Sequence, residues 1–190
     1  MSNAEFRFPK FADEETIHRL YAIWNGWRGE KLFPSRADVD LKALSSHMEG
    51  VILFEVQDRK NIIIRYFGSM IMDFYGSDYT GRNFLDLTDA NVKELRSKRM
   101  LGVVEQPCGA VWTTRGISYG AERSFSVGVS LPIAARAGEA PSQILQVCLP
   151  FRGTERPAFE RKAPTNVQLS DRYAFVDIGA GLADQSVVTE

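Results

Sequence analysis

Two arginines, Arg96 and Arg99, are the residues of this chain whose type and spacing point most directly to chemistry. On a helical wheel of residues 90–104, Arg99 falls within an apolar stripe and Arg96 lies at its edge. The apolar members of that stripe are Val92, Leu95 and Val103. A cation in apolar surroundings needs an anionic or hydrogen-bonded partner, although a long arginine also reaches water easily. The partner could be a carboxylate ligand or a carboxylate of the chain itself, at Asp86, Asp89 or Glu105.

Acid–base catalysis has less support in the sequence. An isomerase-like enzyme on a cone-shaped α+β fold would need a carboxylate or histidine base inside a pocket. Asp73 and Glu122 are the candidates, and neither has an evident acid or nucleophile beside it. The sequence contains no GxSxG, HExxH or Walker-type loop. We therefore expect a protein that is not an enzyme, with the isomerase-like enzyme as an alternative.

Metal binding and charge-driven association are also unsupported. The two cysteines form no CxxC pair and are too few for a zinc site or a disulfide framework. A formal net charge of −1 gives no general attraction to nucleic acid or to an anionic membrane. No apolar run approaches the roughly 20 residues of a membrane helix, and the N-terminus is not typical of a signal peptide. We expect no metal, no nucleic acid, no membrane and a cytoplasmic location.

The elements that must position these residues begin with a hairpin. Apolar runs at 50–56 and 62–67 are joined by a short polar link, which predicts two antiparallel strands. Helical segments fill 69–104, and the longest of them is 90–104. Gly76 is suited to end a helix in a left-handed conformation, and Asp78 and Thr80 are suited to a turn.

Three more strand patterns follow, at 110–117, 123–131 and 143–151. In 123–131 apolar and small polar residues alternate, which is typical of a half-buried strand. The order predicts an α+β domain with a five-stranded antiparallel sheet and helices on one face. Residues 173–178 are either a last strand or a docked extension. We divide the chain into an N-terminal helix and connector (1–48), a core (49–152) and a C-terminal extension (153–190).

An amphipathic helix precedes this core. Asp13 is a good N-cap, and apolar residues follow on one helical stripe. The members of the stripe are Ile17, Leu20, Tyr21, Trp24 and Trp27. Two interpretations remain open: the stripe packs on the protein's own sheet, or it forms a homodimer interface, for which its tryptophans and tyrosine are suitable anchors.

Residues spread along the chain resemble a known family. They are Leu20-Tyr21, Trp24, Arg28-Gly29, Pro34, Arg36, Asp38, Arg65, Gly68, Gly76, Asp78, Thr80, Gly81 and Leu131-Pro132. In this order they resemble a PAS domain, and more narrowly the bacterial stand-alone PAS family 5. The likeness covers about Ile17 to Phe151.

The resemblance implies a sensory or protein-interaction domain in signal transduction. PAS domains commonly hold a small ligand between the sheet and the long helix, or dimerise through the sheet and the N-terminal helix. Here the long helix would be 90–104. The walls of a ligand pocket would be Tyr66, Phe84, Leu95, Arg99, Trp112 and Phe125. The simpler interpretation is that these residues pack the core, as aromatic side chains usually do.

The cofactor remains unknown, but two PAS chemistries are disfavoured. Flavin photosensors of this family place a reactive cysteine after an Asn near a Gly-Arg-Asn sequence. Here Gly81-Arg82-Asn83 is followed by Phe84, so covalent flavin photochemistry is not available at that point. Haem usually takes an axial histidine. His18 and His47 both lie outside 69–149, and a haem-ligating role for Met100 is disfavoured against a core methionine.

Two classes of function are compatible with these residues besides an enzyme. The first is a sensory or regulatory PAS protein that dimerises and changes its binding to a signalling protein when a small ligand enters. The second is a ligand-free dimeric scaffold, supported by the tryptophan-rich N-terminal helix. A defined ligand mass on the purified protein would distinguish the first from the second.

Overall fold

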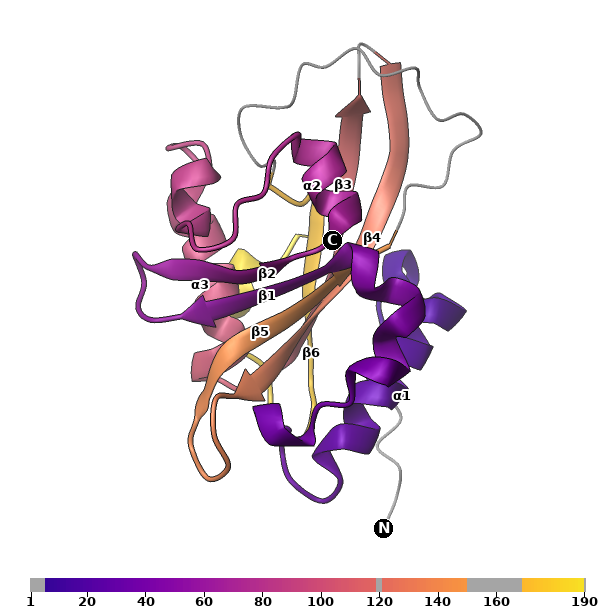
Figure 1. Ribbon diagram of the computed structural model, residues 1–190, viewed down its shortest axis with the longest axis vertical. Coiled ribbons are helices and arrows are strands. Elements are labelled where there is room, and N and C mark those ends of the chain that lie inside the picture. The colour runs from indigo at the N-terminus through magenta and orange to yellow at the C-terminus, as the bar shows by residue number, and fades with distance from the viewer. Residues whose placement is uncertain (1–5, 119–120, 150–168, 190) are drawn as a thin grey trace.

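A six-stranded antiparallel sheet forms the centre of the computed structural model (Figure 1). The structure describes residues 6–118, 121–149 and 169–189, but not the side chains of Phe74, 115–118 and 121–126. The strand order is β2-β1-β5-β4-β3-β6. The strands are β1 (Val51–Val56), β2 (Ile62–Phe67), β3 (Gly109–Ser118), β4 (Ala121–Ala134), β5 (Pro141–Cys148) and β6 (Arg172–Val176).

Helical segments cover both faces of this sheet (Figure 1). The α-helices are α1 (Glu15–Arg28), α2 (Ser69–Tyr75) and α3 (Lys93–Glu105). The 3-10 segments are η1 (Lys10–Ala12), η2 (Arg36–Asp38), η3 (Leu41–Gly50), η4 (Phe84–Leu87) and η5 (Gln185–Val187). The segments inserted between β2 and β3 pack on one face, as predicted, and α1 with η3 packs on the other.

The alternation of the strands supplies an apolar layer to each face. Phe54, Ile62 and Ile64 belong to the core beneath α2 and α3, while Val129 and Val147 belong to the core beneath α1. All five are at most marginally exposed. At roughly 25 cal/mol per Å² of apolar surface, burial on both faces is the main stabilising contribution to the fold. The predicted α+β fold is therefore confirmed.

The C-terminal segment supplies the sixth strand, one more than predicted. β6 pairs antiparallel with β3 from Gly109–Val176 to Thr113–Arg172. Tyr173 and Thr189 then exchange two backbone hydrogen bonds of 2.7 and 2.9 Å, which returns the end of the chain to β6. Between the two alternatives for 173–178, the structure shows a strand, because the outer edge of β3 has unpaired backbone groups that β6 satisfies.

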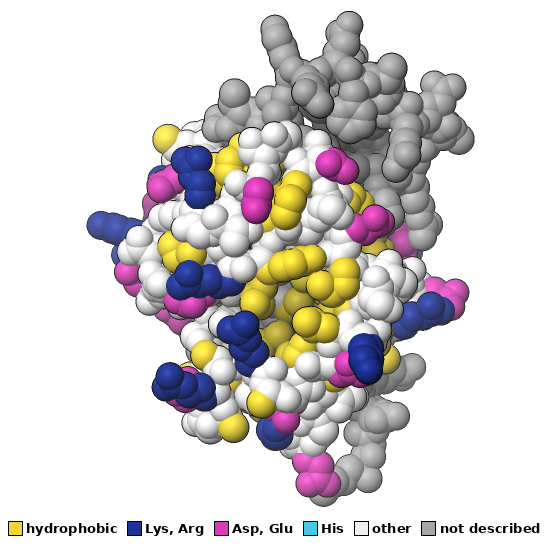
Figure 2. Space-filling view, viewed as in Figure 1, with side chains coloured by type: hydrophobic (Ala, Val, Ile, Leu, Met, Phe, Trp, Pro, Cys, Tyr) yellow, Lys and Arg dark blue, Asp and Glu magenta, His cyan; other side chains and the backbone are white. Residues whose placement is uncertain are grey.

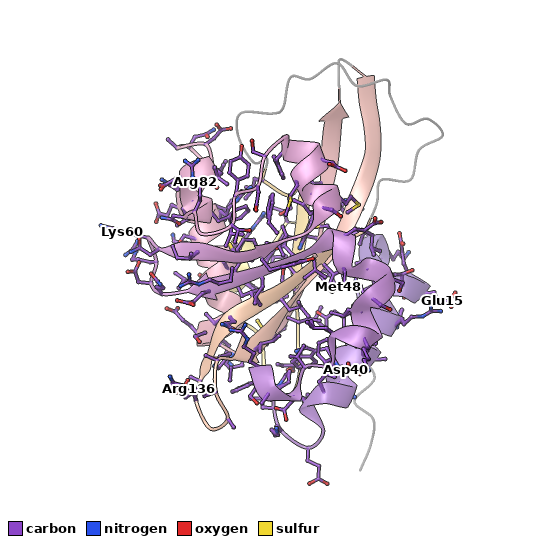
Figure 3. All side chains as sticks on the ribbon, in the orientation of Figure 1. Glu15, Asp40, Met48, Lys60, Arg82 and Arg136 are labelled. Carbon is purple, nitrogen blue, oxygen red and sulfur yellow. The ribbon has the colours of Figure 1, made fainter. Side chains whose placement is uncertain are left out.

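The turn after α2 covers the opposite edge of the sheet. Gly76 ends α2 with a φ of 71°, as predicted, and Asp78 Oδ1 accepts hydrogen bonds from the Thr80 amide and hydroxyl. Asn83 Oδ1 accepts from the Ile62 amide at 3.1 Å, and its Nδ2 donates to the Lys60 carbonyl at 2.7 Å. Lys60 and Arg82 accordingly lie on the same side of the molecule (Figure 3). Gly81-Arg82-Asn83 thus binds the free edge of β2.

The N-terminal helix and connector are anchored to the sheet by specific polar contacts. The indole nitrogen of Trp24 donates to the Pro132 carbonyl at 3.1 Å, and the Ala134 amide donates to the Pro34 carbonyl. Arg28 donates to the carbonyl of Ile178, 150 residues away. The N-cap of α1 is Glu14, not Asp13 as predicted, because the Asp13 carboxylate instead pairs with His18 at 2.7 Å. In the described part of the chain, no helix is both long enough and apolar enough to cross a membrane.

Candidate functional site

The candidate site lies between α3 and the sheet, where two arginines enter the core. Arg96 is 6% exposed and Arg99 is 2% exposed. Their neighbours on α3 include Met100, Val103 and Val104, all buried. A charged side chain almost never occupies such a position unless it is paired or hydrogen-bonded. The partners of each guanidinium therefore indicate which kind of ligand the region could bind.

Arg99 is bound by the C-terminal end of the chain. Its Nε donates to the Val187 carbonyl at 2.9 Å, and its Nη2 donates to the Thr189 hydroxyl at 3.0 Å. Its Nη1 donates to the Ser170 hydroxyl at 2.9 Å and to the Ser170 carbonyl at 3.3 Å. The guanidinium carbon lies 4.6 Å from the ring centroid of Tyr173. None of these acceptors is Asp86, Asp89 or Glu105, the carboxylates considered from the sequence.

Arg96 has a different environment, one turn earlier on α3. Its Nη1 donates to the Thr88 hydroxyl at 3.0 Å, and its guanidinium lies 4.8 Å from the ring centroid of Phe84. Burial lowers the pKa of Arg96 to about 10, with Tyr75 and Asp89 opposing the shift and Arg99 adding to it. Burial also lowers the pKa of Arg99. At a pKa of about 10 Arg96 is still charged at neutral pH, so the region carries positive potential.

An aromatic cluster borders Arg96. The ring centroids of Phe67, Tyr75 and Tyr79 lie between 5.9 and 6.4 Å from one another. Burial raises the pKa of Tyr75 well above its ordinary value, and the charge of Arg96 acts in the opposite direction. Arg82 lies over the outer ring, that of Tyr79, at 5.8 Å. The aromatic rings suit stacking on a planar group, and the arginines suit an anionic group.

The structure brings four of the six predicted pocket residues to this side of the sheet. Phe84 and Arg99 are buried there, and Leu95 and Trp112 are half-buried. Phe84 also contacts Phe54 with a centroid separation of 4.8 Å, and Trp112 lies across Gly128, where a Cβ would meet its ring. Phe125 lies in β4, and its side chain falls outside the described residues.

Tyr66 is on the opposite face, so its predicted place in this pocket is wrong. The β1–β2 ladder pairs Leu53 with Tyr66 and then Phe54 with Ile64, which leaves Arg65 as an extra residue. A bulge of this kind interrupts the two-residue alternation of a strand. Tyr66 therefore points away from α3, is 38% exposed, and donates a long 3.5 Å hydrogen bond to the Met48 carbonyl.

The predicted dimer stripe is buried in the protein's own core. Ile17, Leu20, Tyr21 and Trp24 are 0–1% exposed and pack with residues of the sheet, and Trp27 is half-buried. This is the first of the two interpretations that the sequence left open. The four buried side chains could reach a second subunit only if α1 left the sheet.

Residues considered for catalysis or metal binding are dispersed. Asp73 is exposed on α2, and the side chain of Glu122 lies outside the described residues. His18 on α1 and His47 on η3 belong to the elements of the other face. Among the described side chains, no group of three or more His, Cys, Asp or Glu residues could hold a metal ion. Cys108 and Cys148 are free and buried.

The sequence interpretation missed the residues that bind Arg99. Ser170, Tyr173 and Thr189 lie 71 to 90 positions further along the chain. No local pattern joins a helix to partners at that separation. The available signal was the apolar, strand-like run at 173–178, whose docking would have brought polar flanking residues onto the core.

The fold and the site together define a class before any family comparison. An antiparallel sheet of order β2-β1-β5-β4-β3 has helical segments inserted between β2 and β3 and packed on one face, which agrees with the α+β arrangement expected from the sequence. The chain belongs to the PAS domain family, since the family model PAS_5 matches residues 12–146, more than half of the chain. Membership suggests a sensory or regulatory role. A comparison with curated proteins finds no match.

Proposed function

We propose that the protein is a non-enzymatic sensory or regulatory PAS protein of the cytoplasm that responds to a small ligand bound between α3 and the sheet. The observation that supports this proposal is the burial of Arg96 and Arg99 in an apolar core beside an aromatic cluster. Such groups are costly to keep in a core that serves packing alone. The output would be an altered affinity for a signalling protein, because the chain carries no recognised catalytic motif.

A ligand-free scaffold is the second candidate, and one observation favours it. The predicted pocket residues Phe84, Trp112 and Arg99 already contact other parts of the chain. If no space opens there, the domain serves only to present its surface to a partner. The two candidates differ in whether the purified protein carries or captures a small molecule.

Homodimerisation is part of the proposal and would involve the face of β1 and β2 that is opposite α3. Figure 2 shows apolar side chains gathered near the centre of one face, and Met48 of η3 lies in the same area (Figure 3). Leu41 is 55% exposed and Tyr66 is 38% exposed. Analytical ultracentrifugation of the wild type and of a Tyr66→Glu variant tests this: a concentration-dependent dimer that the substitution weakens supports it, and a monomer at all concentrations contradicts it.

Native mass spectrometry with an absorbance spectrum of the same sample tests the ligand proposal. A defined extra mass on each chain supports the sensor, and the spectrum would begin to identify the ligand. A comparison with Phe84→Ala shows whether the added mass depends on this region. A chain of unmodified mass, both as purified and after incubation with a small-molecule cell extract, favours the scaffold.

A further inference from the structure

The buried guanidinium of Arg99 is hydrogen-bonded without any carboxylate among its described acceptors. The Arg99 guanidinium donates four hydrogen bonds, and all of the acceptors are neutral oxygens. They are the Val187 and Ser170 carbonyls and the Ser170 and Thr189 hydroxyls. Across the described residues, the salt bridges of the chain include none to Arg99. Within the part of the chain that the structure describes, this cation, which is 2% exposed, is thus stabilised by neutral dipoles and by the ring of Tyr173.

Charge and geometry both favour an oxyanion at this position. An oxyanion would add direct charge–charge attraction to these hydrogen bonds, and the planar guanidinium fork matches carboxylate and phosphate bidentately. Arg96 lies three positions earlier on α3 and adds to the positive potential. The charge of Arg99 is close enough to repel that of Arg96 and to lower the pKa of Arg96. The neutral oxygens around Arg99 occupy the places that the oxygens of an anion would take.

The acceptors belong to the C-terminal segment at the edge of the sheet, and none of them lies on α3. Ser170 and Thr189 flank β6, which is an edge strand bonded to the sheet only through β3. Thr189 is exposed and Ser170 is half-buried, so Arg99 Nη1 and Nη2 lie directly beneath surface residues. An edge strand opens at lower free energy than a central strand. Withdrawal of Ser170 and Thr189 would free at least two donors of the guanidinium.

We propose that Arg99 is an oxyanion-binding site that the C-terminal segment occupies as an internal ligand. A small carboxylate or phosphate would replace the Ser170 and Thr189 hydroxyls on Nη1 and Nη2, and β6 would loosen from β3 as a result. This inference rests on the proposed sensory function, for which it names the ligand class and the element that moves. No covalent step is involved, and the output is the exposure of the β3 edge.

Hydrogen–deuterium exchange of residues 172–189 measures this displacement. Wild-type protein is compared in sodium phosphate, sodium acetate and sodium chloride at equal ionic strength, so that specific binding is separated from screening. The structure predicts faster exchange in β6 with phosphate, acetate or both, and not with chloride. Phosphate alone would indicate a phosphate-bearing ligand, and acetate alone a carboxylate.

Variants separate competition from general destabilisation. Ser170→Ala with Thr189→Val removes the competing hydroxyls while leaving Arg99 in place. It is expected to lower the half-saturating anion concentration by about tenfold, which equals about 1.4 kcal/mol. Arg99→Lys is expected to weaken the response and Arg99→Gln to abolish it. Arg136→Gln is the matched control, because the side chain of Arg136 is 84% exposed and its ion pair is with Glu139.

Two results would overturn the proposal. One is unchanged β6 exchange in both the wild type and the Ser170→Ala, Thr189→Val variant, which remains informative even if Arg99→Gln does not fold. The other is an anion effect that persists in folded Arg99→Gln. Native mass spectrometry on the same samples keeps the two claims apart: a neutral ligand on a protein insensitive to anions would leave the sensory function standing and remove only the oxyanion site.

Discussion

Tyr173 and Arg99 are joined by two different contacts, a cation–π contact and a hydrogen bond. The Tyr173 ring lies beneath the Arg99 guanidinium at 4.6 Å, and the Tyr173 hydroxyl donates to the main-chain carbonyl of Arg99 at 3.0 Å. One contact uses the side chain of the arginine and the other its backbone. Together they fix β6 to α3 across the edge of the sheet, so the C-terminal segment and the candidate site form one structural unit.

Tyr173→Phe is expected to destabilise the fold by about 1 kcal/mol, because it removes one buried hydrogen bond and keeps the ring. The free energy of unfolding in urea measures the loss. Tyr66→Phe is the matched control: the Tyr66 hydroxyl is exposed and its bond is 3.5 Å long, so its effect should stay within about 0.5 kcal/mol. Equal effects of the two substitutions would contradict the role assigned to Tyr173.

Gly102→Ala is expected to destabilise the docked C-terminal segment. A Cβ at Gly102 would lie 2.6 Å from Phe175 Cζ and 3.0 Å from the Cβ of Ala183. Overpacking of this kind costs about 1–3 kcal/mol, which outweighs the gain of about 1 kcal/mol from replacing a helical glycine. Hydrogen exchange in β6 should become faster.

Gly26→Ala on α1 is expected to stabilise the protein, in contrast to Gly102→Ala. Nothing lies within 4 Å of a Cβ at Gly26, so only the helix propensity acts, and the unfolding free energy should rise by about 1 kcal/mol. If Gly102→Ala stabilised the protein as much as Gly26→Ala, the close packing of β6 against α3 would be refuted.

Trp24→Phe should cost about 1–3 kcal/mol, since it leaves the buried Pro132 carbonyl without its indole donor and reduces packing on the sheet. Trp27→Phe, at a half-buried position of the same helix, should cost less than about 1 kcal/mol. Chemical denaturation of both variants checks the difference. A larger effect at Trp27, or a loss of self-association without a loss of stability at Trp24, would instead favour the stripe as a subunit interface.

The two buried thiols give a pH dependence of stability. Burial raises the pKa of Cys108 to about 11 and that of Cys148 to about 12, from an ordinary value of 9.0. The unfolded chain therefore loses these protons at lower pH than the folded one. The resulting stabilisation is fully present below pH 9 and declines as pH rises from about 9 towards 12.

Urea unfolding at about pH 8 and about pH 10 measures this decline. A Cys108→Ala, Cys148→Ala variant should lose less stability between the two pH values than the wild type, because the tyrosines that also titrate are common to both proteins. A thiol reagent should label the native wild type slowly at about pH 8. Rapid labelling, or an identical pH response of the two proteins, would contradict the burial of the thiols.

Local patterns predicted most of the strands, and long-range contacts account for what they missed. The predicted strand 62–67 coincides with β2 because a β-branched run between polar turns has few alternatives. The alternation within the same strand predicted the wrong face for Tyr66. A single bulge residue reverses the alternation after it, and no sequence pattern indicates the bulge. Sequence alternation predicts faces only where the ladder is regular.

The candidate site was predictable only in part for a similar reason. The helical wheel placed Arg99 on the buried stripe, where the structure has it. Its partners could not be inferred, because Ser170, Val187 and Thr189 are distant in sequence and bind through hydroxyls and carbonyls that most residues possess. The stripe on α1 shows the same limit: its apolar pattern predicts burial, but it does not distinguish the protein's own sheet from a second subunit.

The most direct test of the sensory account is hydrogen–deuterium exchange of α3 and β6, with and without the small-molecule extract of the cells that produce the protein. The account predicts changed exchange in residues 93–105 and 172–176, together with a higher unfolding temperature, because a ligand that binds the folded state stabilises it. Unchanged exchange in α3 and an unchanged unfolding temperature would contradict the account and favour a ligand-free scaffold.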